Sequence, residues 1–235
     1  MNKQSNVYTI IYIIVLVVVV GTALAITSMA LKDKQQANAD ADKMRQILAS
    51  VRVTPAPASI QTDFDRYITE QLVVDAAGNV IGKDAFDVNV EAQSKITDAA
   101  KRQLPVYICT LDDGAKKYII PVYGAGLWGP IWGYVSIDAD GSTIYGAYFA
   151  HQGETPGLGA EIEKPAFSDQ FHDKVLFKDG EFLPVAVVKA GQKPVGHEDY
   201  VDGVSGGTIT SKGVGAMLSN CLAPYKSFLS TLSTR

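Results

Sequence analysis

A small, polar, glycine-rich stretch near the C-terminus has residue types suited to binding an anionic ligand. Residues 202–214 read Asp-Gly-Val-Ser-Gly-Gly-Thr-Ile-Thr-Ser-Lys-Gly-Val and precede a predicted helix. Glycines let the backbone approach an oxyanion closely, and the free N–H groups at a helix start attract negative charge. On spacing alone, an ordinary helix start near Thr210 or Ser211, capped by one of these hydroxyls, explains the stretch better. Lys212 is either a counter-charge for a phosphate or a solvated lysine.

Two glycine turns upstream could support a flat ring system. Residues 126–134 read Gly-Leu-Trp-Gly-Pro-Ile-Trp-Gly-Tyr, and residues 151–162 read His-Gln-Gly-Glu-Thr-Pro-Gly-Leu-Gly-Ala-Glu-Ile. Each predicts a tight turn that bears apolar or aromatic side chains, and we expect Leu127, Trp128 and Leu158 to contact such a ring. Core packing is the alternative for Trp128 and the favoured interpretation for Trp132.

Other chemistry finds little support in the sequence. The histidines, 151, 172 and 197, are too widely spaced for a helical metal site, and no nucleophile or acid–base pair is signposted, so we expect no metal and no catalytic residue. Cys109 and Cys221 have no metal-ligand spacing and are expected to be buried, with a single disulfide as the alternative. A net charge of −4 with scattered lysines argues against nucleic-acid binding.

The C-terminal stretch resembles Asp-x-x-Ser/Thr-Gly-Ala-Thr, the flavinylation signature of FMN-binding subunits of bacterial respiratory complexes. Gly207 replaces the usual alanine, and the positions that match are Asp202, Ser205, Gly206 and Thr208. The resemblance implies FMN bound covalently through a phosphoester to Thr208, attached by an FAD-dependent FMN transferase. The rival hydroxyls are those of Ser205, Thr210 and Ser211.

The two glycine turns resemble the same subunits, most clearly in the six residues Glu-Thr-Pro-Gly-Leu-Gly at 154–159. Together the three segments resemble the NqrC family, the C subunits of the sodium-translocating NADH:quinone oxidoreductase. The G subunits of the ferredoxin-dependent Rnf complex are the sister family and the alternative. The FMN site expected from this resemblance and from the turns comprises Leu127, Trp128, Glu154, Thr155, Gly157, Leu158, Ser205, Gly206, Gly207, Thr208 and Thr210.

The resemblance implies an electron-relay subunit in a membrane complex that oxidises NADH, reduces quinone and exports sodium, with the other subunits of that complex as partners. The flavin would do the chemistry, and the protein would supply position and electrostatics. The alternative from another class is a non-redox binding module anchored to the membrane, in which the loop at 202–214 is only structural.

The N-terminal residues are expected to anchor the chain in a membrane. No charged residue occurs from Gln4 to Leu31, and residues 9–31 are predicted to form a transmembrane helix. Residues 1–8 are expected to be a cytoplasmic stub and residues 32–53 a stalk helix ended by Pro55 and Pro57. Lysines on both sides leave the orientation undecided by charge. The resemblance implies a single-pass protein of the inner membrane whose soluble part is periplasmic.

Residues 54–235 are expected to form one α+β domain in which hairpins build an antiparallel sheet with a few helices. The Asp-Gly turns at 113–114 and 140–141 predict hairpins between apolar runs. A helix is predicted over 165–172. The strands are predicted at 72–74, 106–111, 118–123, 132–137 and 143–149, and a further hairpin is predicted to pair 175–177 with 183–189.

Overall fold

The computed structural model describes residues 6–232 and divides between Lys43 and Met44 into two units, each described by itself. The predicted stub and the C-terminal end of the predicted domain fall partly outside the described residues. Helix α1 (Asn6–Ser50) begins in the first unit and ends in the second. Within the described residues it is the one helix long and apolar enough to cross a membrane, with a mean hydropathy of 2.9 over its best window. The bounds of the spanning segment stay a prediction.

Helix α1 ends earlier than predicted, and the prolines do not end it. Arg52 adopts a left-handed φ of 62°. Its N–H donates to the carbonyl of Ala49, and the N–H of Val53 donates to the carbonyl of Leu48 at 3.1 Å. These two bonds form a Schellman motif, which satisfies the last carbonyls of the helix before Pro55 is reached.

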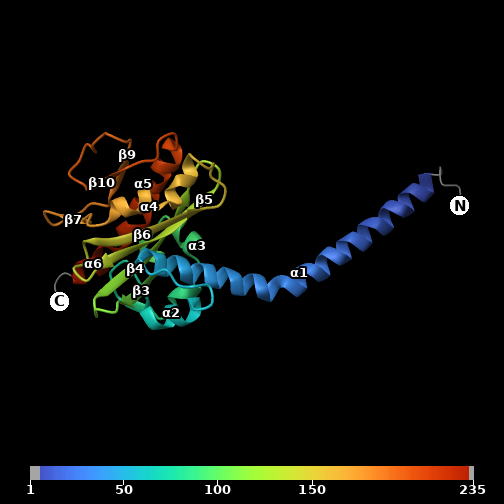
Figure 1. Ribbon diagram of the computed structural model, residues 1–235, viewed down its shortest axis with the longest axis horizontal. Helices are drawn as coiled ribbons and strands as arrows, with labels where there is room; N and C mark the ends of the chain where they lie inside the picture. The colour runs from blue at the N-terminus through green and yellow to red at the C-terminus, as the bar shows by residue number, and fades with distance from the viewer. Residues whose placement is uncertain (1–5, 233–235) are drawn as a thin grey trace. The chain divides into compact units, whose positions relative to one another are not determined.

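The second unit is built on a six-stranded antiparallel sheet (Figure 1). Both Asp-Gly turns connect neighbouring strands as predicted, with left-handed φ values of 81° at Gly114 and 71° at Gly141. In spatial order the strands are β2 (Val80–Gly82), β1 (Ile68–Val74), β3 (Leu104–Thr110), β4 (Lys116–Ala125), β5 (Pro130–Asp138) and β6 (Ile144–His151).

Helices cover both faces of this sheet, which confirms the α+β class. One face packs against α5 (Thr208–Leu222) and α6 (Lys226–Leu232), and α4 (Pro165–Ser168) belongs to the same core and contacts the edge strand β6. The other face packs against the end of α1 and against α2 (Ile60–Tyr67), which the sequence patterns had not predicted. Strand β3 is buried on both sides for this reason and reads as a continuous apolar run.

The two cysteines lie on opposite faces of the sheet. Cys109 belongs to the core that contains the end of α1, whereas Cys221 belongs to the core around α5. Both are buried free thiols, and the Cys221 Sγ contacts the backbone of Tyr123 at 3.4 Å. The sheet between them rules out the alternative of a disulfide, since bridged Cα atoms lie within about 7 Å of each other.

The predicted hairpin over 175–189 is wrong in extent. Strands β7 (Phe177–Lys178) and β8 (Glu181–Phe182) pair for two residues each. Strand β9 (Ala186–Val188) leaves this hairpin and pairs in parallel with β10 (Tyr200–Asp202). Asp199, just before β10, contacts both parts: its side chain accepts from the N–H of Val175 and the ammonium of Lys178, and its carbonyl accepts from the N–H of Ala186 in β9.

The remaining helices are short. The helix predicted over 165–172 is divided into α4 and the 3-10 turn η4 (Asp169–Phe171). The other short helices are α3 (Val90–Ser94), η1 (Ala85–Asp87), η2 (Ala99–Lys101), η3 (Gly159–Glu163) and η5 (Ala223–Tyr225).

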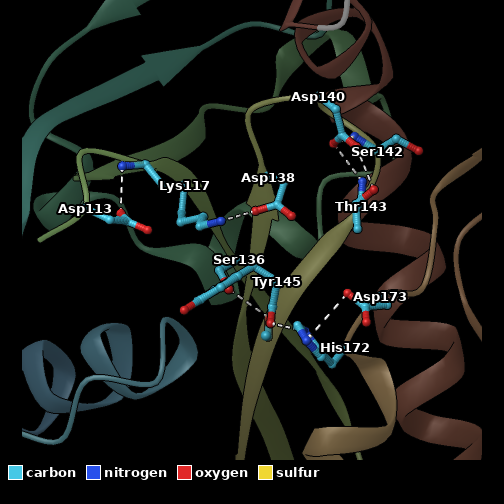
Figure 2. A network of polar contacts seen from close by, with 12 residues as sticks. Asp113, Lys117, Ser136, Asp138, Asp140, Ser142, Thr143, Tyr145, His172 and Asp173 are labelled. Carbon is cyan, nitrogen blue, oxygen red and sulfur yellow. Dashed lines mark hydrogen bonds and ion pairs between the residues drawn. The ribbon is translucent and has the colours of Figure 1, made fainter. Parts of the chain in front are cut away.

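A buried polar network ties β4, β5 and β6 together. Figure 2 shows Lys117 directed at Asp138, with which it forms an ion pair. The Lys117 Nζ also lies 4.0 Å from the centre of the Tyr145 ring. The hydroxyl of Ser136 donates to the carbonyl of Ser50 at 2.6 Å and so joins the sheet to the end of α1. The ion pair and the ring contact satisfy Lys117, which is only 8% exposed.

Candidate cofactor site

The last long helix begins at the residue that the family motif nominates. Helix α5 starts at Thr208 with Gly207 in the N-cap position, and the N–H of Ser211 donates to the Gly207 carbonyl at 2.9 Å. The helix therefore starts two to three residues before the predicted start near Thr210 or Ser211. No side chain caps the helix, so neither of these hydroxyls has the capping role that the ordinary interpretation gave it.

The four hydroxyls of this loop differ sharply in exposure. Thr210 is 1% exposed and donates to Glu154 Oε2 at 2.5 Å. Ser211 is 5% exposed and accepts from the N–H of Val204 at 2.9 Å. Ser205 and Thr208 are exposed. The tertiary structure thus separates two accessible hydroxyls from two that are buried and hydrogen-bonded.

Glu154 joins the three segments that the sequence analysis singled out. Its Oε1 accepts from the N–H of Trp128 at 2.8 Å, and its Oε2 accepts from Thr210. The N–H of Glu154 itself donates to Nδ1 of His151 at 3.1 Å. Burial alone would raise the pKa of Glu154, but the hydrogen bonds from Thr210, Trp128 and Leu127 outweigh burial and lower it.

The turn between β4 and β5 presents two apolar side chains to solvent. The N–H of Gly126 donates to the Gly129 carbonyl at 2.8 Å and closes the turn. Leu127 is 48% exposed and Trp128 is 69% exposed, so core packing is the wrong interpretation for Trp128. Trp132 is half-buried, and its Nε1 donates to Gln46 near the end of α1.

The turn after β6 brings a third apolar side chain to the start of α5. Gly157 has a φ of 76°, and the N–H of Leu158 donates to the Thr155 carbonyl at 3.1 Å. Leu158 is 43% exposed. A Cβ placed on Gly206 would lie 2.6 Å from Leu158 Cδ2, so the glycine of the motif gives room to this leucine.

A cleft of about 420 Å³ opens beside Thr208. Its walls come from the motif loop, from the first turn of α5, and from the connection between β9 and β10. Three lysines line it, namely Lys189, Lys193 and Lys212, together with Thr208, Ser205 and Gly206. The predicted contacts Leu127, Trp128, Glu154, Thr155, Gly157 and Leu158 are not part of its walls.

Lys189 and Lys193 line the candidate cleft, and the sequence analysis did not single them out. They follow β9 and carry no motif, and only the parallel pairing of β9 with β10 brings them beside the loop at 203–208. The one signal available in the sequence was that residues 189–193 contain two lysines and a glycine.

This arrangement fits an FMN phosphoester. An exposed hydroxyl stands at the positive end of a 15-residue helix, and three ammonium groups line the adjoining cleft. On neighbouring turns, Leu127, Trp128 and Leu158 supply exposed apolar surface of the kind that packs against a flat ring.

Comparisons with known proteins identify an FMN-binding domain. The model of the FMN-binding domain family matches residues 126–223, from the first glycine turn to just past the end of α5. The C subunit of the Na+-translocating NADH-quinone reductase of Vibrio anguillarum is 35% identical over 188 residues, which cover 74% of this chain and 73% of that protein. Its counterpart in Chlamydia muridarum is 30% identical, over 79% of this chain and 69% of that protein.

Two solved structures have the same fold. The crystal structure of the C subunit of the Na+-translocating NADH-quinone reductase from Parabacteroides distasonis matches with a TM-score of 0.79 and 50% identity, over 85% of this chain and 97% of that chain. The crystal structure of the Shewanella oneidensis NqrC protein matches in fold with a TM-score of 0.69 at 24% identity, over 84% of this chain and all of that one. The chain belongs to the NqrC family, the C subunits of the Na+-translocating NADH-quinone reductase, and contains the FMN-binding domain of that family.

Proposed function

We propose that this chain carries FMN as a phosphoester on Thr208 and relays electrons within a membrane complex that oxidises NADH, reduces quinone and exports sodium. The observation that carries the attachment site is the exposure of the Thr208 hydroxyl at the start of α5, beside a cleft lined by lysines. FMN supplies electron transfer when bound. The chain's own residues bind and orient it.

The attachment chemistry needs one free hydroxyl on this chain. The Thr208 oxygen bonds to the FMN phosphorus of FAD, the bond between the two FAD phosphates breaks, AMP leaves, and the hydroxyl proton passes to the transferase or to water. Thr210 and Ser211 fit this role poorly, because both are almost completely buried and already hydrogen-bonded. Ser205 is the remaining rival, since it is exposed and lines the same cleft.

The charges around Thr208 favour a retained phosphate. A phosphodiester keeps one negative charge, and the start of a helix stabilises such a charge by about 0.3–1 kcal/mol at an exposed position. Lys212 lies near the start of α5, and Lys189 and Lys193 line the same cleft from the connection after β9. We infer that these lysines hold the phosphate, while Leu127, Trp128 and Leu158 contact the isoalloxazine.

The test is the mass and colour of the protein made together with an FAD-dependent FMN transferase. We expect a yellow protein that is heavier by one FMN less one water. Thr208→Ala should abolish the adduct, whereas Ser205→Ala and Thr210→Ala should keep it. A colourless wild-type protein of unmodified mass would refute flavin attachment, and an adduct that survives Thr208→Ala would move the acceptor to another hydroxyl.

The partners and the orientation are proposals that rest on membership of the NqrC family. Their names describe a reductase with several subunits, so we propose that the other subunits of such a complex bind this chain. The apolar helix is consistent with a single-pass anchor, and we propose that the soluble unit faces the periplasm of the inner membrane. Copurification with an NADH-oxidising, sodium-dependent set of subunits tests the first point, and protease access to residues 44–232 in sealed vesicles of known sidedness tests the second.

Family membership favours this complex over an Rnf-type complex and over a non-redox binding module.

A further inference from the structure

One buried carboxylate links the two glycine turns and the start of α5 in the proposed flavin site. Glu154 is 5% exposed, and its two oxygens accept from different elements. Oε1 holds the turn between β4 and β5 through the N–H of Trp128, and Oε2 holds α5 through the hydroxyl of Thr210. The side chain therefore bridges the turn that presents Leu127 and Trp128 to the helix that begins at Thr208.

The glycines of the two turns leave room for this bridge. A Cβ on Gly126 would lie 2.5 Å from Glu154 Oε1, and a Cβ on Gly159 would lie 2.5 Å from Thr210 Oγ1. Neither glycine has a left-handed φ, so backbone conformation does not require them. A side chain is excluded at both positions because the carboxylate and its threonine partner already occupy the space.

The bridge also distinguishes the two threonines at the start of α5. Thr208 and Thr210 are two residues apart at the start of the same helix, and they differ in that the Thr210 hydroxyl donates its only proton to Glu154. A hydroxyl that is buried and donates to a carboxylate cannot be reached by a large nucleotide donor. Thr208 has no such restraint on its exposed side chain.

We propose that Glu154 is a positioning residue that directs flavin attachment to Thr208, by holding the Thr210 hydroxyl in the core and fixing the start of α5 against the apolar turns. This inference rests on the proposed attachment of FMN to Thr208. Glu154 touches neither reacting atom; it acts through Thr210 and through the backbone of Trp128.

The experiment uses the full chain made with the FMN transferase, and it measures by peptide mass spectrometry the ratio of adduct on Thr210 to adduct on Thr208. Glu154→Ala removes the bridge, and Glu154→Asp keeps the charge but shortens the side chain by one methylene, so that it cannot reach both partners. In both variants we expect the ratio to rise about 10-fold or more, a factor that corresponds to about 1.4 kcal/mol. Glu154→Asp keeps the test decisive if the alanine variant does not fold.

Glu154→Gln should keep the wild-type ratio. The glutamine oxygen can accept from the turn, while its amide nitrogen donates to Thr210 Oγ1, so the bridge persists without charge. The matched control is Glu181→Ala, because Glu181 is an exposed glutamate on β8, outside the site. A residue with only a structural role would lower total flavin and thermal stability without moving the adduct.

Three outcomes separate this inference from the proposed function. A wild-type protein without an adduct on Thr208 refutes the proposed attachment itself. A wild-type protein with that adduct, together with an unchanged ratio in Glu154→Ala and Glu154→Asp, overturns the role of Glu154 alone. A ratio that shifts in Glu154→Gln as much as in Glu154→Ala also overturns it, because the bridge would then not be the cause.

Discussion

Gly159→Ala should destabilise the protein by displacing the pair that Glu154 forms with Thr210. The added methyl group would lie 2.5 Å from Thr210 Oγ1 and even closer to Glu154 Oε2, whereas real Cβ atoms essentially never approach a heavy atom within 3.0 Å. The obstacle is a buried, hydrogen-bonded carboxylate rather than the free end of an exposed side chain. The carboxylate has to move, and the bond to Thr210 has to break.

The expected loss combines two effects. Overpacking a filled site costs about 1–3 kcal/mol, and losing a hydrogen bond to a charged group costs about 1.5–3 kcal/mol. We therefore expect a loss of roughly 3–5 kcal/mol in the free energy of unfolding. For a unit of this size, that loss lowers Tm by about 10 °C.

The assay is thermal unfolding of the full chain in detergent, followed by circular dichroism. Gly153→Ala is the matched control, because it lies in the same turn, has no heavy atom within 4 Å of an added Cβ, and does not have a left-handed φ. It should stay within about 0.5 kcal/mol of wild type. If Gly159→Ala melts within about 2 °C of wild type, the pair of Glu154 and Thr210 does not fill that space, and the reasoning fails.

Three further predictions concern buried groups. Because the folded state lowers the pKa of Glu154, the carboxylate contributes stability that is present above its ordinary pKa of 4.5 and is lost as pH falls through the folded value. Between about pH 6 and about pH 3, Tm should therefore fall more steeply for wild type than for Glu154→Gln. Parallel curves for the two proteins would contradict this. Asp138→Ala should cost about 3 kcal/mol in urea unfolding because it leaves the buried ammonium of Lys117 without its charged partner. Lys117→Met should cost less, because it leaves a carboxylate that water can reach. The reverse order would refute the argument. Burial raises the pKa of Cys109 to about 12 and also raises the pKa of Cys221. Neither thiol should react with a thiol reagent in the native protein, and both should react in denaturant. A crosslinked pair after mild oxidation would contradict their placement on opposite faces of the sheet.

Local patterns in the sequence predicted those parts of the fold that depend on neighbouring residues. The Asp-Gly turns fixed the hairpins around Gly114 and Gly141, because glycine adopts the left-handed φ that such turns require. The apolar run near the N-terminus predicted one long helix, because length and composition alone make a helix able to cross a membrane. Helix α2 and strand β10 were missed because they are short: α2 repeats its apolar residues Ile60, Phe64 and Tyr67 at helical spacing over only eight residues, and β10 has three.

Family resemblance nominated the motif loop and the two glycine turns, and the structure brings all three together around Glu154. Apart from that resemblance, the residues themselves could not rank Thr208 against Thr210, because the two have the same side chain within the same short stretch. Burial ranks them, and burial depends on the distant residues that pack over each.

By itself the sequence determined the long apolar helix, the two Asp-Gly hairpins and the α+β class, and through family resemblance it nominated the three segments of the site, because each of these features depends on residues that are close together along the chain. Only the tertiary structure decided that Thr208 is exposed while Thr210 is held by Glu154. It also decided that Lys189 and Lys193 face the motif loop, and that the two cysteines stand apart. Those features join residues from different strands and helices, and their contacts exist only once the sheet has been assembled and covered on both faces.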